Sequence, residues 1–152
     1  MCDSFDLTQE IDIDASPELV FRFFTDAELL ARWLCVRAET DPRTGGSFTL
    51  NVTGTHVTRG TFRELEPGRR LAFTWLFDHV QPPVPTTVEV TLTPVGRGTR
   101  VRLRHYGFAD RTLRDRHAEG WEHYLPRLAA AASGTDPGPD AWSTTGAGGP
   151  GT

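Results

Sequence analysis

Residues 60–75 read Gly60-Thr61-Phe62-Arg63-Glu64-Leu65-Glu66-Pro67-Gly68-Arg69-Arg70-Leu71-Ala72-Phe73-Thr74-Trp75. Pro67-Gly68 in the middle of this stretch is a strong turn signal. After the turn, Leu71, Phe73 and Trp75 occupy every second position, so they share one face of a strand. The stretch therefore predicts two antiparallel strands joined by a tight turn, with an apolar inner face.

Strand patterns continue on both sides of this hairpin. Turn signals recur at short intervals between residues 36 and 108, which indicates an antiparallel meander. Residues 5–13 also alternate between apolar and polar types, which predicts a first strand with one wet face. In the last strand, three arginines alternate with residues that we expect to face inward. The arginines are Arg100, Arg102 and Arg104, and the inward residues are Thr99, Val101, Leu103 and His105. We expect the arginines to face water.

Two short helices are predicted after the first strand. Ser16 suits an N-cap and Pro17 the first helical position, which predicts a helix over residues 17–25. Asp26 can cap a second short helix that carries Trp33.

A long C-terminal helix begins at Asp110 or Thr112 and runs to about Ala132. Apolar and aromatic residues form a stripe at helical spacing: Leu113, His117, Gly120, Trp121, Tyr124, Leu125 and Leu128. Glycine is costly inside a helix, so Gly120 indicates close packing against a bulky neighbour such as Trp33, or room left for a ligand. Residues 134–152 are rich in Gly, Pro, Ser and Thr. We expect one domain over 1–133 and a disordered tail over 134–152.

Composition narrows the function classes. The chain has 152 residues and a net charge of -4, which disfavours a nucleic-acid partner. Cys2 and Cys35 are the two cysteines, and a structural disulfide between them is not expected. The N-terminus lacks the regions of a signal peptide, and no apolar run has the length of a membrane span. We expect a soluble cytoplasmic protein that does not bind membranes.

Six segments in order carry a family resemblance. They are Ala15-Ser16-Pro17-Glu18-Leu19-Val20-Phe21, Trp33, Gly45-Gly46-Ser47-Phe48, the stretch 60–75, the strand 99–105 and Gly120-Trp121. With these segments the chain resembles the SRPBCC superfamily, the START-related helix-grip proteins. It is most similar to the bacterial branch named after the activator of the ninety-kilodalton heat-shock protein ATPase. The resemblance covers about residues 7 to 132.

The resemblance implies an α+β helix-grip fold. A curved antiparallel sheet of six or seven strands wraps around the long C-terminal helix, and the two short helices close one end. Members of the superfamily bind apolar small molecules such as lipids, sterols and polyketides, and a minority are cyclases, aromatases or hydrolases. A cavity between the sheet and the C-terminal helix is therefore expected.

Eleven residues are candidates to line such a cavity. They are Trp33, Phe48, Leu50, Phe62, Trp75, Val90, Leu103, His105, Trp121, Tyr124 and Leu125. Aromatic walls offer large contact area, and Trp and Tyr keep a polar tip that can orient a ligand. The alternative is that these side chains fill an ordinary core. For His105 the functional roles are a hydrogen bond to a ligand or general-base catalysis, and the alternative is a histidine bonded to the backbone, Tyr106 or Tyr124.

Metal, cofactor and nucleophile motifs are missing from the sequence. His117 and His123 are six residues apart on a helix and so lie on different faces. No zinc spacing, phosphate-binding loop or nucleophile motif is present, and Cys35 has no recognisable histidine partner. Asp78-His79 lies at a plausible cavity mouth, where solvated side chains are the usual case. We expect no metal and no cofactor.

The sequence is compatible with three functions. The first is binding of a small apolar or amphipathic molecule in the cavity, without catalysis. The second is a polyketide-type cyclase or aromatase of the same fold, in which His105, Tyr124 or Asp78 transfers protons. The third is a protein-interaction module, either a chaperone partner or a homodimer that exposes a sheet edge. A wide cavity would favour ligand binding, and polar side chains that meet inside it would favour catalysis. An exposed apolar patch would favour a protein-interaction module.

Overall fold

The computed structural model describes residues 5–78, 84–138 and 140. Within them the chain forms an α+β fold whose elements follow one another in the order β1 (Phe5–Ile13), α1 (Pro17–Thr25), α2 (Ala27–Leu30), β2 (Arg37–Thr40), β3 (Ser47–Asn51), β4 (Val57–Glu66), β5 (Arg70–Phe77), β6 (Thr86–Val95), β7 (Gly98–Phe108) and α3 (Arg111–Ala132).

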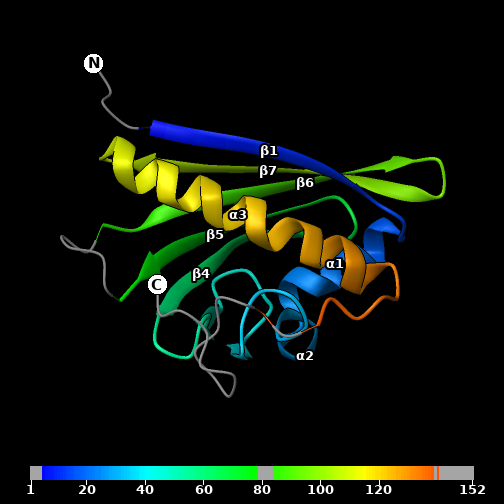
Figure 1. Ribbon diagram of the computed structural model, residues 1–152, viewed down its shortest axis with the longest axis horizontal. Coiled ribbons are helices and arrows are strands. Elements are labelled where there is room, and N and C mark those ends of the chain that lie inside the picture. Colours follow the sequence, from blue (N-terminus) through cyan, green and yellow to red (C-terminus); the bar gives the residue numbers. More distant parts are fainter. Residues whose placement is uncertain (1–4, 79–83, 139, 141–152) are drawn as a thin grey trace.

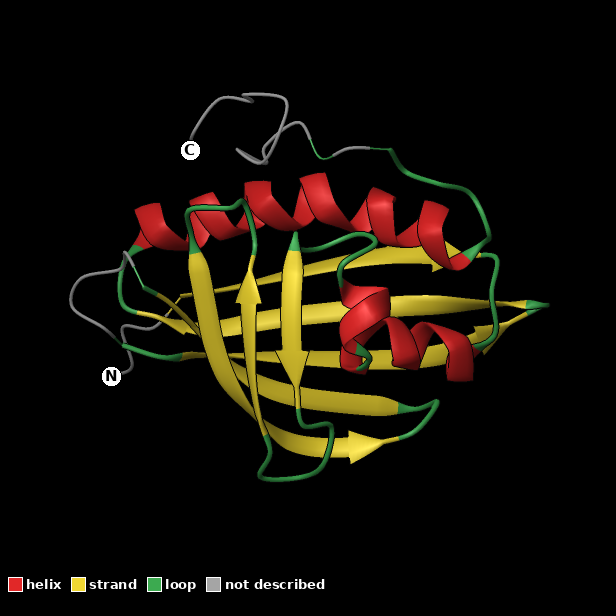
Figure 2. Ribbon diagram, turned by 90° about the horizontal axis from the view of Figure 1, so that it is seen from below, coloured by secondary structure: helices red, strands yellow, loops and turns green. Residues whose placement is uncertain are grey.

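The strands form a single curved sheet. Its order is β1-β7-β6-β5-β4-β3-β2, with seven strands paired antiparallel throughout. The long helix α3 crosses this sheet (Figure 1), and Figure 2 shows α3, α1 and α2 on the same face, inside the curve of the strands. The predicted helix-grip architecture is therefore confirmed, with seven strands.

The helix starts follow the predicted caps. The Ser16 hydroxyl accepts a hydrogen bond from the Leu19 amide at 3.2 Å, and Pro17 is the first residue of α1. The Asp26 side chain caps α2 in the same way. Of the two proposed starts of α3, Asp110 is the cap: its carboxylate accepts the Thr112 amide at 2.6 Å. Each cap satisfies an amide that has no partner inside the helix.

Two glycines play opposite roles. A Cβ at Gly60 would lie against the Thr74 carbonyl oxygen and 2.5 Å from the Phe48 ring, so glycine is required for that ring to cover β4. At Gly120, by contrast, a Cβ would meet no atom of the described residues within 4 Å outside the backbone of its own helix. The prediction that Gly120 packs closely against a bulky neighbour is therefore wrong, because its missing side chain would point into open space.

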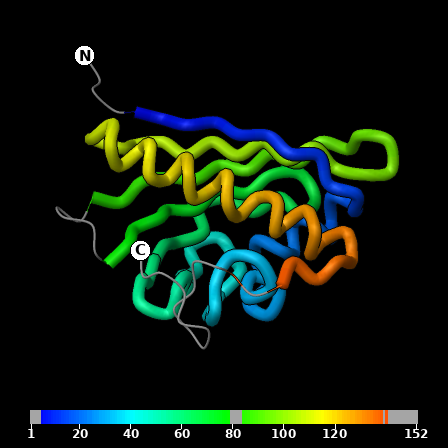
Figure 3. The backbone as a smooth tube through the Cα atoms, viewed as in Figure 1, coloured from blue at the N-terminus to red at the C-terminus, as the bar shows by residue number. Residues whose placement is uncertain are grey.

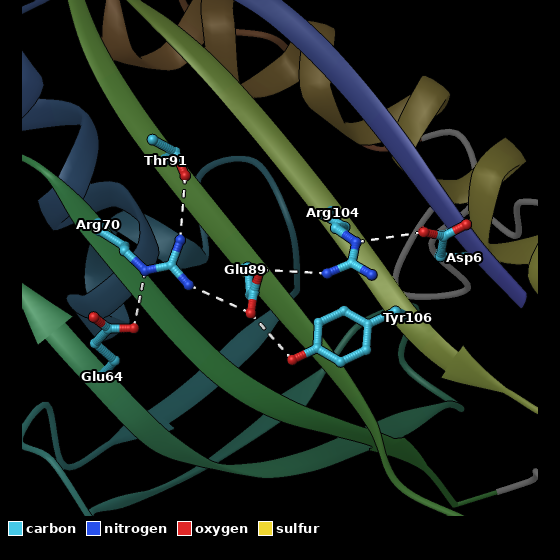
Figure 4. A network of polar contacts seen from close by, with 7 residues as sticks. All are labelled: Asp6, Glu64, Arg70, Glu89, Thr91, Arg104 and Tyr106. Carbon is cyan, nitrogen blue, oxygen red and sulfur yellow. Dashed lines mark hydrogen bonds and ion pairs between the residues drawn. The ribbon is translucent and has the colours of Figure 1, made fainter. Parts of the chain in front are cut away.

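The outer face of the sheet carries a charge network. Glu89 on β6 pairs with Arg70 on one side at 3.3 Å and with Arg104 on the other at 3.8 Å, as Figure 4 shows. The network continues to Glu64 on β4 and to Asp6 on β1. Further along β7 the same pattern repeats in the pairs Arg100 with Asp12 and Arg102 with Glu10. The arginines of β7 face outward as predicted, each opposite an acid.

Exposed apolar side chains are few and separated. Among the described residues the large exposed ones are Val36, Val84 and Val95. Val84 precedes β6, Val95 is the last residue of β6, and Val36 precedes β2. In the part of the chain that the structure describes, no helix has the length and apolar character of a membrane span.

Candidate functional site

All eleven predicted lining residues are buried in the core. Each is at most 5% exposed. Trp121 of α3 packs against Trp75 of β5, with ring centroids 5.3 Å apart, and its ring also lies 6.2 Å from that of His105. These contacts, with the buried Leu125 and Leu128, belong to the core between α3 and the sheet.

A small empty space remains elsewhere in the core. Its volume is about 10 Å³, and its walls come from α1, α2, the turn after α2 and strands β3 to β5: Phe24, Leu30, Leu34, Phe48, Leu50, Phe62, Phe73 and Trp75. None of these residues belongs to α3. This space therefore lies away from the position predicted between the sheet and the C-terminal helix, where Trp121 packs against Trp75.

Four of the predicted residues line this space, namely Phe48, Leu50, Phe62 and Trp75. Phe24, Leu30, Leu34 and Phe73 were missed. The signal for Phe73 was present, since it shares the inner face of its strand with Trp75. The sequence had no comparable signal for Phe24, because its place in the wall depends on how α1 packs against distant strands.

The indole N–H of Trp75 differs in its hydrogen bonding from those of the other two tryptophans that the structure describes. The Trp33 indole N–H donates to the Phe23 carbonyl oxygen at 2.9 Å, and the Trp121 indole N–H donates to His105 at 3.1 Å. The Trp75 indole nitrogen is buried and has no hydrogen-bond partner among the described residues. The hydroxyl of Thr58 is also buried and has no hydrogen-bond partner among the described residues. Thr58 pairs with Phe77 across β4 and β5, which places it on the same face as Trp75.

His105 is held at both ring nitrogens. The Thr86 hydroxyl donates its proton to the Trp75 carbonyl oxygen at 3.0 Å, so it must accept the 2.6 Å hydrogen bond from the His105 Nε2–H. The His105 Nδ1 accepts the bond from the Trp121 indole N–H. The inward direction predicted for His105 is confirmed, but its partners are Thr86 and Trp121 instead of Tyr106 or Tyr124.

This environment keeps His105 neutral. Burial lowers the pKa of His105 well below its ordinary value, and the neighbouring His117 lowers it further. The two imidazole rings lie 5.1 Å apart. Because the one lone pair of the neutral ring accepts the Trp121 bond, His105 has no free atom with which to take a proton from a substrate.

The other two proton-transfer candidates have partners of their own. The Tyr124 hydroxyl donates to the Asp140 carboxylate at 2.6 Å, and burial followed by this hydrogen bond raises the Tyr124 pKa. The Asp78 carboxylate accepts the Val57 amide at 3.3 Å. His79 lies outside the described residues. Within the described ranges no three His, Cys, Asp or Glu side chains gather where they could hold a metal ion.

A larger hollow of about 710 Å³ lies at the far end of α3. Its walls are the turn after α2, the end of α3 and the segment that follows: Ala31, Arg32, Trp33, Cys35, Val36, Arg127, Ala131, Gly134, Thr135, Asp136, Pro137, Gly138 and Asp140. Burial raises the pKa of the Cys35 thiol to about 12, which keeps it protonated and poorly nucleophilic. The turn 31–36 separates this hollow from the aromatic space, because Leu30 and Leu34 point to one side and Cys35 to the other.

Part of the predicted tail contributes to this hollow. After α3 the chain turns back beside the turn 31–36, as the orange segment in Figure 3 shows. Residues 134–138 and 140 are described, and the Thr135 amide donates to the Ala130 carbonyl oxygen at 2.8 Å. Residues 139 and 141–152 lie outside the described part. Disorder over the whole of 134–152 stays a prediction.

Several solved structures share this fold. An AHSA1-like protein from Rhizobium etli is 41% identical, with 90% of this chain and 87% of that chain covered and a TM-score of 0.72. CalU16 from Micromonospora echinospora is 27% identical, with 88% and 69% covered and a TM-score of 0.74. An Aha1 dimer from Colwellia psychrerythraea is 20% identical, with 85% and 96% covered and a TM-score of 0.73, which is a likeness of fold.

A comparison with family models identifies the family of this chain. No curated protein matches the sequence. The family model described as activator of Hsp90 ATPase homolog 1-like protein matches residues 14–133, which include both short helices, strands β2 to β7 and the whole of α3. The fold agrees with the SRPBCC superfamily that the sequence resembles. This chain belongs to the family of activator of Hsp90 ATPase homolog 1-like proteins.

Proposed function

We propose that this protein binds a small apolar molecule that carries a hydrogen-bond acceptor, in the aromatic space between α1, α2 and strands β3 to β5, without transforming it. The observation that carries this proposal is the buried indole N–H of Trp75, which has no partner among the described residues. It belongs to a side chain that lines the space.

An unpaired buried donor is costly. Leaving such a group unsatisfied costs roughly 1–3 kcal/mol, and most buried polar groups in proteins are bonded. A ligand carbonyl or ether oxygen next to Trp75 would remove this cost. The surrounding phenylalanines offer an apolar wall with few polar groups, which is the usual character of a small-molecule site.

The space must widen to admit a ligand. At about 10 Å³ it has room for roughly one water molecule. Its inner wall consists of sheet residues. The opposite wall is formed by Phe24 of α1 together with Leu30 and Leu34, which belong to a four-residue helix and the turn after it. A helix this short has little stability of its own. Outward movement of α2 and this turn is therefore the cheapest route to a larger cavity.

Binding without chemistry is the better supported of the two ligand functions. A cyclase or aromatase needs a group that can take or give a proton near the bound molecule. His105 is a titratable side chain close to Trp75, with ring centroids 6.1 Å apart, and its hydrogen bonds to Thr86 and Trp121 use both nitrogens. Through these hydrogen bonds His105 joins strand β6 to helix α3.

The test compares two ligands of the same shape. We would titrate 2-acetylnaphthalene, which has a carbonyl acceptor, and 2-ethylnaphthalene, which has none, while recording the Trp75 indole N–H signal by NMR. The signal is assigned by its disappearance in Trp75→Phe. We expect the ketone to bind and move this signal downfield, and Trp75→Phe to weaken ketone binding about fivefold while leaving the hydrocarbon unchanged.

A second variant tests the position of the site. Leu34→Phe places extra volume in the space and should abolish binding of both compounds in a protein whose circular dichroism remains native. Absence of any spectral change with either compound in the folded wild-type protein would overturn the proposal of ligand binding. Equal binding of both compounds by wild type and Trp75→Phe would overturn the role of the indole N–H.

A further inference from the structure

The segment after α3 places a carboxylate against two side chains of that helix. The Asp140 carboxylate accepts the Tyr124 hydroxyl at 2.6 Å through one oxygen and lies 2.7 Å from the His123 Nε2 through the other. The Asp140 side chain is only 9% exposed. This contact does not depend on the aromatic space or on Trp75.

The two donors form a preorganised pair. Tyr124 is 5% exposed, and its ring meets that of His123 edge to face with centroids 4.7 Å apart. The rings therefore hold each other in the orientation in which both polar tips reach one carboxylate. Two hydrogen bonds to the two oxygens of a carboxylate are stronger and more directional than one.

Arg127 lies one helical turn further along α3. Its Nε donates to the Trp33 carbonyl oxygen at 3.1 Å and its Nη1 to the Pro137 carbonyl oxygen at 3.4 Å. Arg127 thus holds both the turn 31–36 and the segment after α3, and it adds positive charge to the hollow of 710 Å³. Arg32 adds a second positive charge to the wall, and Asp136 a negative one.

Asp140 separates this pair of donors from the hollow. Asp140 lines the hollow, whereas Tyr124 and His123 are not among the lining residues. Removing the Asp140 carboxylate would therefore open the two donors to a space whose remaining walls include Ala31, Val36 and other apolar surface. A volume of about 710 Å³ lies within the usual range of roughly 300–1,000 Å³ for small-molecule sites.

We propose that Tyr124 and His123 form a carboxylate-binding site, and that Asp140 fills it as an internal competitor of an organic carboxylate with an apolar body. The carboxylate of the ligand takes the place of Asp140, and its apolar part occupies the hollow. Residues 134–138 and 140 then act as a strap that closes the site when no ligand is present.

The strap has hydrogen bonds to α3 that do not involve Asp140. It is anchored at its start by the Gly134 and Thr135 amides, which bond to the carbonyl oxygens of Ala131 and Ala130. Gly134 and Gly138 have positive φ values of 95° and 76°, a conformation that suits glycine and allows the chain to bend there. Displacement of Asp140 therefore leaves the anchor and α3 in place.

The test uses decanoate as the carboxylate probe and decanol as its neutral counterpart, with binding measured by isothermal titration calorimetry on the full chain. A competitor tethered in the same chain acts at an effective concentration in the millimolar range. Asp140→Ala should therefore bind decanoate about tenfold more tightly than wild type and decanol unchanged. Asp115→Ala is the control, since Asp115 is an exposed acid of α3 that does not line the hollow, and its decanoate affinity should equal that of wild type.

A second variant identifies the donors. Adding Tyr124→Phe to Asp140→Ala should return decanoate binding to the wild-type level, and decanoate should shift the His123 Nε2 NMR signal in Asp140→Ala alone. Equal decanoate affinity in wild type and Asp140→Ala, or weaker affinity in the variant, would overturn the proposal. Trp75→Phe should leave the decanoate result unchanged, which separates this site from the aromatic space.

Discussion

The Trp121 indole N–H donates a 3.1 Å hydrogen bond to Nδ1 of His105, and this bond joins α3 to β7 inside the core. It requires His105 to be neutral, because a protonated ring has no lone pair at Nδ1. The attachment of the long helix to the sheet is therefore coupled to the protonation of one buried histidine.

The first prediction concerns pH. Burial and His117 hold the pKa of His105 well below its ordinary value of 6.5 in the folded protein, whereas the unfolded chain protonates this residue near that value. The unfolded state then binds more protons below about pH 6.5. The free energy of unfolding should be unaffected by this group above that pH and fall by up to about 1.4 kcal/mol per unit below it.

Urea denaturation between pH 5 and 7.5 measures this effect. His105→Gln removes the titrating ring, so the difference in unfolding free energy between wild type and variant should shrink as the pH falls. Parallel pH profiles of the two proteins would show that His105 titrates normally.

The second prediction concerns Thr86. Thr86→Val deprives the Trp75 carbonyl oxygen of a donor and the His105 Nε2–H of an acceptor, both in the core. We expect the free energy of unfolding to fall by about 2 kcal/mol in urea denaturation. Thr87→Val, at the next position and on the outer face, should change it by less than about 0.5 kcal/mol. Equal effects of the two substitutions would contradict the network.

The third prediction compares two glycines. Gly120→Ala adds a methyl group in open space inside α3 and should raise the free energy of unfolding by about 0.5–1 kcal/mol, since alanine is the better helix former. Gly60→Ala puts the same methyl group against the Thr74 carbonyl oxygen and the Phe48 ring, so it should destabilise the protein. Thermal unfolding of both variants shows whether each substitution stabilises or destabilises the protein. A destabilised Gly120→Ala would contradict the conclusion that Gly120 faces open space.

The fourth prediction concerns the outer face. Glu89→Gln removes the negative charge between Arg70 and Arg104, and Glu89 is 24% exposed at its side chain. We expect a loss of about 1 kcal/mol at low salt that diminishes in 1 M salt, because ions screen partly exposed pairs. Glu39→Gln, in a pair whose side chains are 79% and 74% exposed, serves as the control and should have no measurable effect.

The caps show what is predictable from a short stretch. Ser16 and Asp26 each bond to an amide two or three residues ahead, so the sequence around them contains both partners. The alternation of Arg102 and Leu103 along β7 is equally local, because it follows from the two-residue repeat of a strand. These repeats and caps, together with the family resemblance, were sufficient to predict a helix-grip fold with six or seven strands, and the structure has seven.

The candidate sites depend on distant partners. Trp33, Trp75 and Trp121 look alike in the sequence, yet the first donates to a residue ten positions away, the last to one sixteen positions away, and Trp75 to none of the described residues. Which indole remains unpaired is decided by packing between β5, β7 and α3. The same is true of the aromatic space, whose walls come from α1, α2, the turn after α2 and strands β3 to β5.

The sequence by itself determined the order, the helix caps and the inner faces of the helices and strands, because caps and repeats depend on residues two to four positions apart. The end of α2 was not predicted, since α2 stops at Leu30 and Trp33 lies in the turn after it. The tertiary structure alone decided that His105 is bonded at both nitrogens, that Gly120 faces open space and that Asp140 reaches Tyr124. Each of these facts joins residues whose distance in space is set by the whole fold, and no local pattern encodes that distance.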